Sequence, residues 1–283
     1  IPAMITHFKI RGKKNWGRSA ALIRRIDEAR AAGIDVTMAQ YPYTAGSTFL
    51  HVVIPPWYHS RGVDGLLRAL REERGAIKHD LDTRMDWENF SQSVGWEKIF
   101  VSSVVSEANQ PCVGKSISQI AAERGHADAA DAAFDLLVEE QLAVGMISFG
   151  LDEADITAIM RHPAVSFITD GLMSGRPHPR AYATYPRILG RYVREQGVLS
   201  LEEAVRKMTS LPARKIRLRN KGVIAEGYDA DLVVFDPDTV IDKNSYDDPR
   251  VHPAGIAHVL VNGVFVVEDA ALTGARPGRV IRD

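Results

Sequence analysis

The spacing of hydrophobic positions changes near Pro212. Before that residue, short apolar runs alternate with stretches in which apolar side chains recur at helical spacing. After it, short apolar runs are separated by turns containing Gly and Asp. Alternating strands and helices are typical of a parallel sheet covered by helices, whereas short strands joined by turns are typical of an antiparallel sheet. The pattern therefore predicts an α/β region at 1–212 and a small β region at 213–283.

Three apolar runs in the first region have the character of buried parallel strands. They are Met4–Phe8, Asp35–Tyr43 and Val165–Asp170. A helix is predicted at Ser19–Ala32, between the first two strands, because apolar residues recur there at helical spacing. Another helix is predicted at Glu153–Arg161, directly before the third strand. Met146–Phe149 is expected to add a further short strand.

A long segment separates the second strand from Met146. It spans roughly 100 residues, far more than the ~2–6 of an ordinary connection between a strand and a helix. Helices are predicted within it at Gly65–Arg74 and Ala129–Glu140, and aromatic residues cluster around Trp87–Phe90. An insertion at about 49–145 can be a lid over an active face or a subdomain that serves only packing, and the pattern leaves both interpretations open.

The β region contains a clear hairpin signal. Apolar runs at Ile256–Val261 and Val264–Glu268 are joined by Asn262-Gly263, and Leu232–Phe235 forms an earlier run. Asn-Gly between two apolar runs is the strongest short-range sign of a β-hairpin. A small β domain is therefore predicted here.

The composition narrows the class of protein. The 283 residues carry a formal net charge of −1, and no long run of one sign favours nucleic acid or an anionic membrane as a partner. No apolar stretch approaches the ~20 residues of a membrane-spanning helix. Cys112 is the one cysteine, so a disulfide framework within the chain is excluded, and this usage fits a reducing compartment. We therefore expect a cytoplasmic protein.

The stretch Val165–Glu195 carries the most specific chemistry. The third predicted strand ends in Asp170, and the loop that follows, Arg176-Pro-His-Pro-Arg180, is stiffened by two prolines. A carboxylate at the end of a buried strand, followed by a rigid cationic loop, is expected at the active face of a (β/α) barrel. An Asp that caps the next helix is the alternative. On this segment alone neither interpretation is favoured.

A family resemblance is carried by several strings that together reach across nearly the whole chain. They are THFKIRGKKNWGRS, YPYTAGST, TDG…RPHPRAYATYPRILGRYVRE, LSLEEAVRKMTSLPA, GYDADLVVFDPDTV and ALTGARPGRVIR. In these strings the chain resembles the N-acyl-D-amino-acid deacylases (D-aminoacylases) of the amidohydrolase superfamily. The resemblance implies an α/β fold: the C-terminal portion of a TIM-like (β/α)8 metal-dependent hydrolase barrel at 1–212, with a lid inserted at about 49–145. It also implies the C-terminal part of a small β-sandwich domain at 213–283.

The resemblance further implies a zinc site. Zinc activates a water and polarises a carbonyl when three protein ligands leave one position open. His7, which would otherwise be read as a core histidine, matches a zinc ligand. Asp170 matches a ligand that also takes a proton from the water and passes it to the leaving nitrogen. One tight zinc ion is expected, with a second, weaker one as an alternative. The family's His-x-His pair, its metal-ligating Cys and another strand-end His have no match in this sequence. Cys112 lies in the insertion and is expected to be an ordinary cysteine of the lid.

Substrate-binding residues are implied in the same way. A planar guanidinium is the group best suited to a free α-carboxylate. Arg180 matches the family's carboxylate-binding Arg, Lys9 matches its Lys partner, and Ser47 matches a hydroxyl near that carboxylate. Tyr41 matches the tyrosine that steadies the developing oxyanion. Solvated charges and aromatic packing are the alternative interpretations, and His178 between its prolines is interpreted as structural.

These matches predict zinc-dependent hydrolysis of the amide bond of N-acyl-D-amino acids, giving a carboxylate and a free D-amino acid. A cyclic amidase of the dihydroorotase or hydantoinase type is one alternative, and a non-catalytic chain that binds a protein partner is another. Because only about three of the eight strands of a barrel are found, we expect an N-terminal half to complete it. That half would belong to the same polypeptide or to a companion chain.

Overall fold

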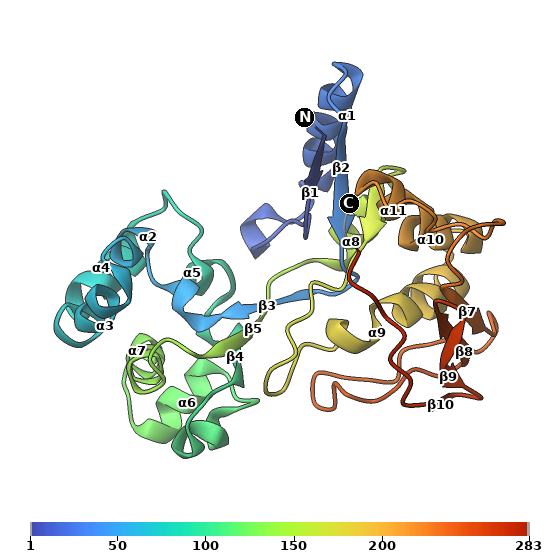
Figure 1. Cartoon of the computed structure of the whole chain (residues 1–283). Coiled ribbons are helices and arrows are strands. Elements are labelled where there is room, and N and C mark those ends of the chain that lie inside the picture. Colours follow the sequence, from blue (N-terminus) through green and yellow to red (C-terminus); the bar gives the residue numbers. More distant parts are fainter. Residues whose placement is uncertain (1, 282–283) are drawn as a thin grey trace.

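The first region contains a three-stranded parallel sheet with the strand order β1-β2-β6. This computed structural model describes residues 2–281 (Figure 1). The strands are β1 (Ala3–Ile5), β2 (Val36–Gln40) and β6 (Val165–Phe167). Met38 is in register with Ile5 on one side and with Val165 on the other. All three strands are shorter than the predicted runs: β2 and β6 fall within theirs, whereas β1 begins one residue earlier, at Ala3, and ends at Ile5. Every residue of β2 and β6 is buried.

Helices cover this sheet as the spacing of apolar residues predicts. Helix α1 (Ser19–Ala31) connects β1 to β2, and α8 (Glu153–Met160) leads into β6. Ile26 and Ile159, one from each helix, pack with Met38 in a single buried cluster. Both helices begin where predicted and end one residue earlier. After β6 the chain forms further helical segments: α9 (Arg180–Arg187), the π-helical η5 (Ile188–Glu195), α10 (Leu201–Met208) and α11 (Ser210–Lys215).

A second sheet is antiparallel, with the order β3-β5-β4. Its strands are β3 (Ala45–Phe49), β4 (Ile99–Ser103) and β5 (Gly145–Phe149). The predicted strand at Met146–Phe149 therefore exists, but it pairs with β3 and β4 rather than with the parallel sheet. Phe49 and Gly145 are cross-strand partners. The two ends of segment 50–144 therefore lie side by side. We call residues 50–144 the inserted segment.

The inserted segment has a hydrophobic core of its own, to the left in Figure 1. Phe134 and Leu70 are fully buried in it, and Cys112 lies in the same cluster. Its helices are η2 (Leu50–Val53), α2 (Pro56–His59), α3 (Gly62–Glu72), α4 (Arg74–Thr83), α5 (Phe90–Val94), η3 (Trp96–Lys98), η4 (Glu107–Cys112), α6 (Ile117–Arg124) and α7 (Ala129–Glu139). The helices predicted at Gly65–Arg74 and Ala129–Glu140 correspond to α3 and α7. The short η1 (Lys13–Asn15) lies outside this segment, between β1 and α1.

The C-terminal region forms a four-stranded antiparallel sheet with the order β10-β9-β8-β7. Its strands are β7 (Leu232–Phe235), β8 (Ile256–Val261), β9 (Val264–Glu268) and β10 (Ala271–Leu272). The predicted hairpin is confirmed: Asn262 and Gly263 both have positive φ, 48° and 79°, as a two-residue hairpin turn requires.

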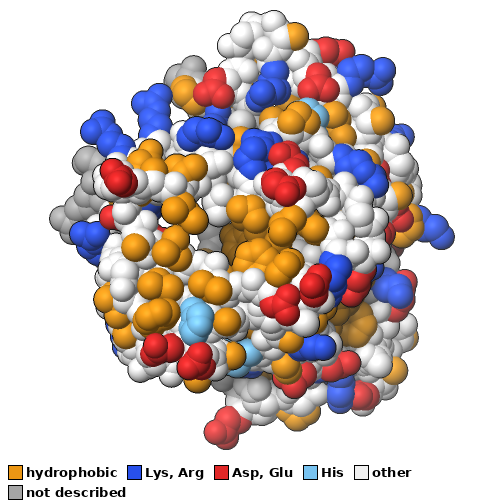
Figure 2. All heavy atoms as spheres, turned by 90° about the vertical axis from the view of Figure 1, so that its right-hand side faces the viewer, with side chains coloured by type: hydrophobic (Ala, Val, Ile, Leu, Met, Phe, Trp, Pro, Cys, Tyr) orange, Lys and Arg blue, Asp and Glu red, His pale blue; other side chains and the backbone are white. Residues whose placement is uncertain are grey.

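This sheet is open to solvent. None of the residues in β7–β10, all of which the structure describes, is buried. Figure 2 shows hydrophobic side chains gathered around a hollow on this side of the molecule. The hollow is a groove of about 960 Å³ between the sheet and α9–α10, and apolar side chains such as Leu189 and Ile256 line it. A sheet with neither face buried is unusual, because a sheet normally buries at least one face against another layer.

None of the helices between residues 2 and 281 combines the length and the hydropathy that crossing a bilayer requires.

Candidate active site

The three parallel strands bring predicted site residues to one edge of their sheet. His7 follows β1, Tyr41 follows β2, and Asp170 lies just beyond β6. Phe8 donates its N–H to Ala39 O at 2.8 Å, so the backbone pairing continues past the end of β1. Side chains at the carboxyl ends of parallel strands share one face of the fold, which is where α/β enzymes place their active sites.

His7 and Asp170 share an uncommon backbone conformation. Their φ angles are 42° and 47°, in the left-handed region that residues other than glycine adopt rarely. Residues held in such conformations are concentrated at functional sites, where the surrounding structure compensates for the strain. The imidazole of His7 and the carboxylate of Asp170 are therefore positioned by the same left-handed backbone conformation after their strands.

Lys9 connects His7 to the rest of the site. Its Nζ lies 3.1 Å from His7 Nδ1 and donates to the His7 carbonyl oxygen at 2.9 Å. Burial lowers the pKa of Lys9 to about 8; the charge of Asp170 opposes this shift, and the charge of Arg11 adds to it. A lysine with this pKa is still mostly charged at neutral pH and is near its titration point in mildly alkaline solution.

Arg180 is buried beneath Tyr41, with an exposed fraction of 1%. Its Nη2 lies 3.0 Å from Asp170 Oδ2 and donates to the Ser47 carbonyl oxygen at 3.1 Å. Its Cζ lies 4.4 Å from the centre of the Tyr41 ring. Its Nε and Nη1 have no hydrogen-bond partner among residues 2–281. Because buried guanidinium nitrogens are normally paired, this side chain retains unused capacity for an anion.

Tyr41 and Ser47 complete the set. Tyr41 is 3% exposed, and burial raises the pKa of its phenol above the ordinary value although Arg180 opposes the shift. The phenol therefore stays protonated and can donate a hydrogen bond. Ser47 lies in β3 and contributes its carbonyl oxygen to Arg180. Arg180 contacts Asp170, Ser47 and Tyr41. His7 is connected to this group through Lys9, whose Nζ lies 5.7 Å from the centre of the Tyr41 ring.

His178 fixes the backbone from which Arg180 projects. It is fully buried; its Nδ1 accepts the Arg180 backbone N–H at 3.0 Å, and its Nε2 lies 3.0 Å from the Ala45 carbonyl oxygen. Burial and the nearby Arg180 charge lower its pKa well below the usual range, so the ring is neutral, with the proton on Nε2. These contacts agree with the structural interpretation of His178 and show that it positions Arg180 against β3.

The loop between Asp170 and Arg180 is also held at its outer turn. Arg176 donates its backbone N–H to Ser102 O at 2.7 Å, and its guanidinium lies 2.5 Å from Asp247. Arg250 donates to Gly175 O at 2.5 Å. The rigid loop expected from its prolines is therefore fixed on one side by β4 and on the other by residues 247–250.

Arg11 is a site residue that the sequence analysis did not single out. Its side chain is 9% exposed, its Nη2 donates to Ser148 Oγ at 2.8 Å, and its Cζ lies 3.6 Å from the centre of the Phe90 ring. The alternation of His7, Lys9 and Arg11 was the available signal, because alternate residues of an extended chain point to the same side.

A metal site is only partly present in this chain. Among residues 2–281, no group of three or more His, Cys, Asp or Glu side chains is arranged to hold a metal ion. His7 and Asp170 offer an imidazole and a carboxylate, which suit zinc in type, but a catalytic zinc takes three protein ligands. Cys112 is a free thiol in the core of the inserted segment, 3.8 Å from Arg124 Nη2. The donors therefore fit zinc as an incomplete set.

Comparison with known proteins places the chain in a family. Residues 110–267, more than half of the chain, match the model of the amidohydrolase family. An N-acyl-D-glutamate deacylase of Alcaligenes xylosoxydans xylosoxydans is 39% identical over 280 residues, covering 99% of this chain and 48% of the relative. A D-aminoacylase of the same organism is 36% identical over 282 residues, covering 99% of this chain and 49% of the relative. The chain thus spans about half the length of these relatives.

A solved structure agrees with these sequences. The N-acyl-D-glutamate deacylase of Bordetella bronchiseptica, crystallised with zinc and a phosphonate inhibitor that mimics the tetrahedral intermediate of the reaction, superposes with a TM-score of 0.78. It is 34% identical, and the match covers 100% of this chain and 50% of that one. The chain belongs to the amidohydrolase family and resembles its N-acyl-D-amino-acid deacylases over almost its whole length.

Proposed function

We propose that this chain is part of a zinc-dependent hydrolase that cleaves the amide bond of N-acyl-D-amino acids, releasing a carboxylate and a free D-amino acid. The observation that carries the proposal is the buried Arg180, which lies beside the strand-end carboxylate of Asp170 and has two nitrogens without a partner among residues 2–281. An N-acyl amino acid has a free α-carboxylate next to its scissile amide. The pair therefore supplies an anion-binding group beside an acid–base group, as this substrate requires.

Each site residue then has a defined role in substrate binding or in the reaction. Arg180 and Lys9 bind the α-carboxylate, with the Ser47 hydroxyl beside it. Tyr41, kept protonated by burial, donates a hydrogen bond to the oxygen that becomes negative as the amide carbonyl is attacked. Asp170 takes the proton of the attacking water and passes it to the leaving nitrogen.

Zinc would supply the activated water and polarise the carbonyl. His7 and Asp170 are the donors that this chain offers to one tight ion, and a second, weaker ion remains an alternative. The solved relative that was crystallised with zinc supports the choice of metal.

We further propose that residues 1–212 are the C-terminal portion of a TIM-like (β/α)8 barrel, with the inserted segment as its lid, and that residues 213–283 belong to a small β-sandwich. Three parallel strands with helices in the order expected for β/α units support the barrel. The solvent-exposed sheet β7–β10 and the apolar groove beside it support a missing second layer.

A companion structure would complete the donor set. We propose that an N-terminal half, in the same polypeptide or as a separate chain, pairs with the open edge of β1 and supplies the remaining ligands. The relatives are about twice as long as this chain, and β1 pairs only with β2 in the part that the structure describes. We call this chain together with that half the assembled enzyme.

The decisive experiment measures turnover by the assembled enzyme of N-acetyl-D-methionine, N-acetyl-L-methionine and a hydantoin, together with its zinc content. Selective hydrolysis of the linear D-substrate with stoichiometric zinc is expected. Turnover of the hydantoin alone would favour a cyclic amidase. Neither zinc nor turnover would favour a non-catalytic, partner-binding chain.

A further inference from the structure

A basic cavity of about 590 Å³ lies beside the proposed site. It is bounded by the β1–α1 connection and the start of α1 on one side, and by residues 85–93 of the inserted segment on the other. Five cationic side chains line it, against a single acidic one, Glu88; the cations are Lys9, Arg11, Lys14, Arg18 and Arg25. Clustered charges of one sign in a cleft raise the local potential and attract ligands of the opposite sign.

Arg11 is the group at the inner end of this cavity. Nine-tenths of its side chain is buried, and its Nε has no hydrogen-bond partner among residues 2–281. Glu88 Oε1 lies 3.7 Å from this Nε, beyond hydrogen-bond distance, and two-thirds of the Glu88 side chain is exposed. A buried guanidinium that lacks a full set of partners favours an anionic ligand, because an unpaired buried donor is costly.

The cavity adjoins the proposed carboxylate clamp. A carbon atom placed as the Cβ of Gly46 would lie 3.2 Å from the Tyr41 hydroxyl and 3.8 Å from Arg11 Nη1. The Tyr41 hydroxyl and Arg11 Nη1 therefore both face the space beside Gly46. Arg180 lies over the same tyrosine ring, so Tyr41 has one guanidinium near its hydroxyl and another over its ring.

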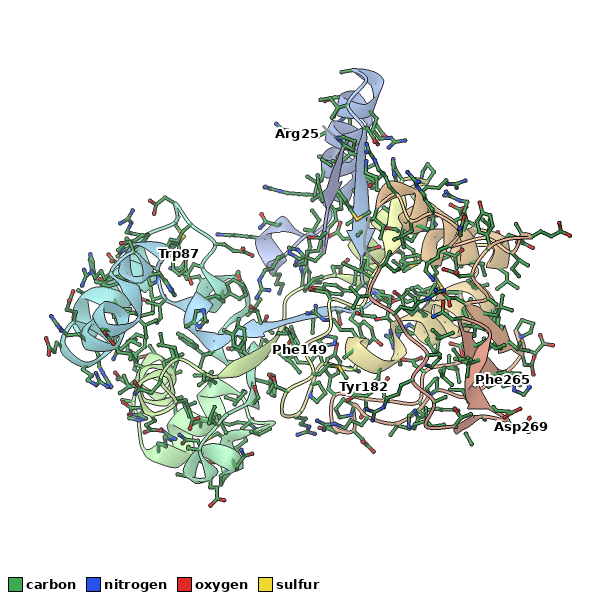
Figure 3. All side chains as sticks on the ribbon, viewed as in Figure 1. Arg25, Trp87, Phe149, Tyr182, Phe265 and Asp269 are labelled. Atoms are coloured by element: carbon green, nitrogen blue, oxygen red, sulfur yellow. The ribbon has the colours of Figure 1, made fainter. Side chains whose placement is uncertain are left out.

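The outer cations are free to act on a ligand. Lys14, Arg18 and Arg25 form no salt bridge with any described acidic side chain. In Figure 3, Arg25 extends from α1 on the side where the inserted segment carries Trp87. These exposed charges strengthen the field at the mouth of the cavity, and the buried Arg11 offers the directed contact.

We propose that this cavity receives an anionic side chain of the substrate, so that the preferred substrates are N-acyl derivatives of acidic D-amino acids. The inference rests on the proposed function: Arg180 and Lys9 bind the α-carboxylate, and Arg11 binds the second carboxylate across Tyr41. An uncharged side chain of the same size leaves Arg11 with its unpaired nitrogen. Discrimination against it is therefore strong, as in other sites built around a buried polar partner.

A purely structural role for Arg11 predicts different results. Its contact with Ser148 joins the β1–α1 connection to β5, and its contact with Phe90 joins that connection to the inserted segment. If that were its whole function, loss of Arg11 would weaken binding of charged and uncharged substrates alike. Removal of Glu88 would then have no effect on selectivity.

The test compares N-acetyl-D-glutamate with N-acetyl-D-glutamine, an uncharged substrate of nearly the same shape. In the assembled enzyme, kcat/KM for the acid should exceed that for the amide by at least about tenfold, and Arg11→Gln should reduce this ratio by roughly 10–100-fold. Arg24→Gln, which removes the same charge from α1 outside the cavity, should leave the ratio unchanged. Glu88→Gln should raise the ratio a few-fold, a gain that loss of folding cannot produce.

Two outcomes would overturn the inference: a wild-type preference for the amide, or an equal loss with both substrates in Arg11→Gln. Titration calorimetry of the same two compounds separates this inference from the proposed function. If no N-acetyl-D-amino acid is hydrolysed, the proposed function fails. Tighter binding of the acid that Arg11→Gln abolishes would still support the cavity, and equal binding of both compounds would refute it.

Discussion

The carboxylate of Asp170 is paired with the guanidinium of Arg180, with 3.0 Å between Asp170 Oδ2 and Arg180 Nη2. In the proposed reaction each group has a different partner: Asp170 exchanges protons with the water and the leaving nitrogen, and Arg180 binds the α-carboxylate. The pair gives the buried guanidinium a counter-charge that it would otherwise lack, which limits the cost of burying it. Binding of metal and substrate therefore involves an exchange of partners at Arg180.

Replacing Asp170 with Asn should preserve the shape of the side chain while removing its basicity. We expect kcat of the assembled enzyme to fall by ~10²–10⁴-fold, the usual contribution of a positioned acid–base group. Asp64→Asn, an exposed carboxylate in the first turn of α3, is the matched control and should have no effect. A variant that retained full kcat for an N-acyl-D-amino acid would exclude Asp170 from proton transfer.

The Arg180→Lys variant should keep the charge and lose the planar fork. A lysine cannot contact Asp170 and Ser47 O in the present geometry and also receive a carboxylate, so kcat/KM should fall by about 1.5–3 kcal/mol of transition-state stabilisation. Steady-state kinetics with N-acetyl-D-methionine measure the loss. Arg24→Lys on the exposed face of α1 serves as the control. Unchanged kcat/KM would remove Arg180 from the site.

Lys9 should make substrate binding sensitive to pH. Because its pKa is lowered to about 8 by burial, Lys9 loses its charge as the pH rises through that value, and its attraction for the α-carboxylate is lost with it. KM should be flat below pH ~8 and rise above it, whereas kcat changes less because a bound carboxylate raises the pKa of Lys9. Lys9→Arg should abolish the rise, since arginine stays charged. The same alkaline rise in that variant would contradict the assignment.

His178→Ala should disturb binding more than chemistry. It leaves the Arg180 N–H and the Ala45 carbonyl without partners, at a cost of about 1–3 kcal/mol in the free energy of unfolding. With Arg180 less firmly placed, KM should increase by a larger factor than kcat decreases. His178→Asn, whose side-chain oxygen can replace Nδ1 as acceptor, should recover part of both effects. A stable Ala variant with normal KM would assign His178 to packing alone.

Hydrogen exchange tests the inserted segment as a lid. Its residues 85–93 form one wall of the basic cavity, so a bound substrate should protect their amides. The helices α6 and α7, which pack on each other in the segment's own core, provide an internal reference that should change little. Equal protection of 49–145 with and without an N-acyl-D-amino acid would favour the packing interpretation.

The spacing of apolar residues and the residue types at turns predicted the individual helices and the hairpin well. Helix α1 and the Asn262-Gly263 hairpin depend on interactions close in sequence, so their patterns identify them with little ambiguity. The run at Met146–Phe149 was also found, but its partners were not predicted. Pairing of β5 with β3 brings together residues about a hundred positions apart, and an apolar run carries no information about which edge it will meet.

In the candidate site, too, some residues could be identified from the local sequence pattern and others could not. Asp170 ends an apolar run and is visible from the sequence as a strand-end carboxylate. His7, Lys9 and Tyr41 gained roles only through the family resemblance, because an isolated side chain of these types is usually structural or solvated. Arg11 was missed because its contacts are with Phe90 in the inserted segment and Ser148 in β5, residues that are distant from it in the sequence.

The pairing of Phe49 with Gly145 has a consequence for how such proteins diversify. Because the inserted segment leaves and returns at neighbouring positions, its length and content can change without altering the register of the parallel sheet. Residues 85–93, which form one wall of the basic cavity, belong to the inserted segment, whereas Asp170 and Arg180 lie outside it. Grafting the inserted segment between relatives would therefore exchange one wall of the basic cavity and leave Asp170 and Arg180 in place.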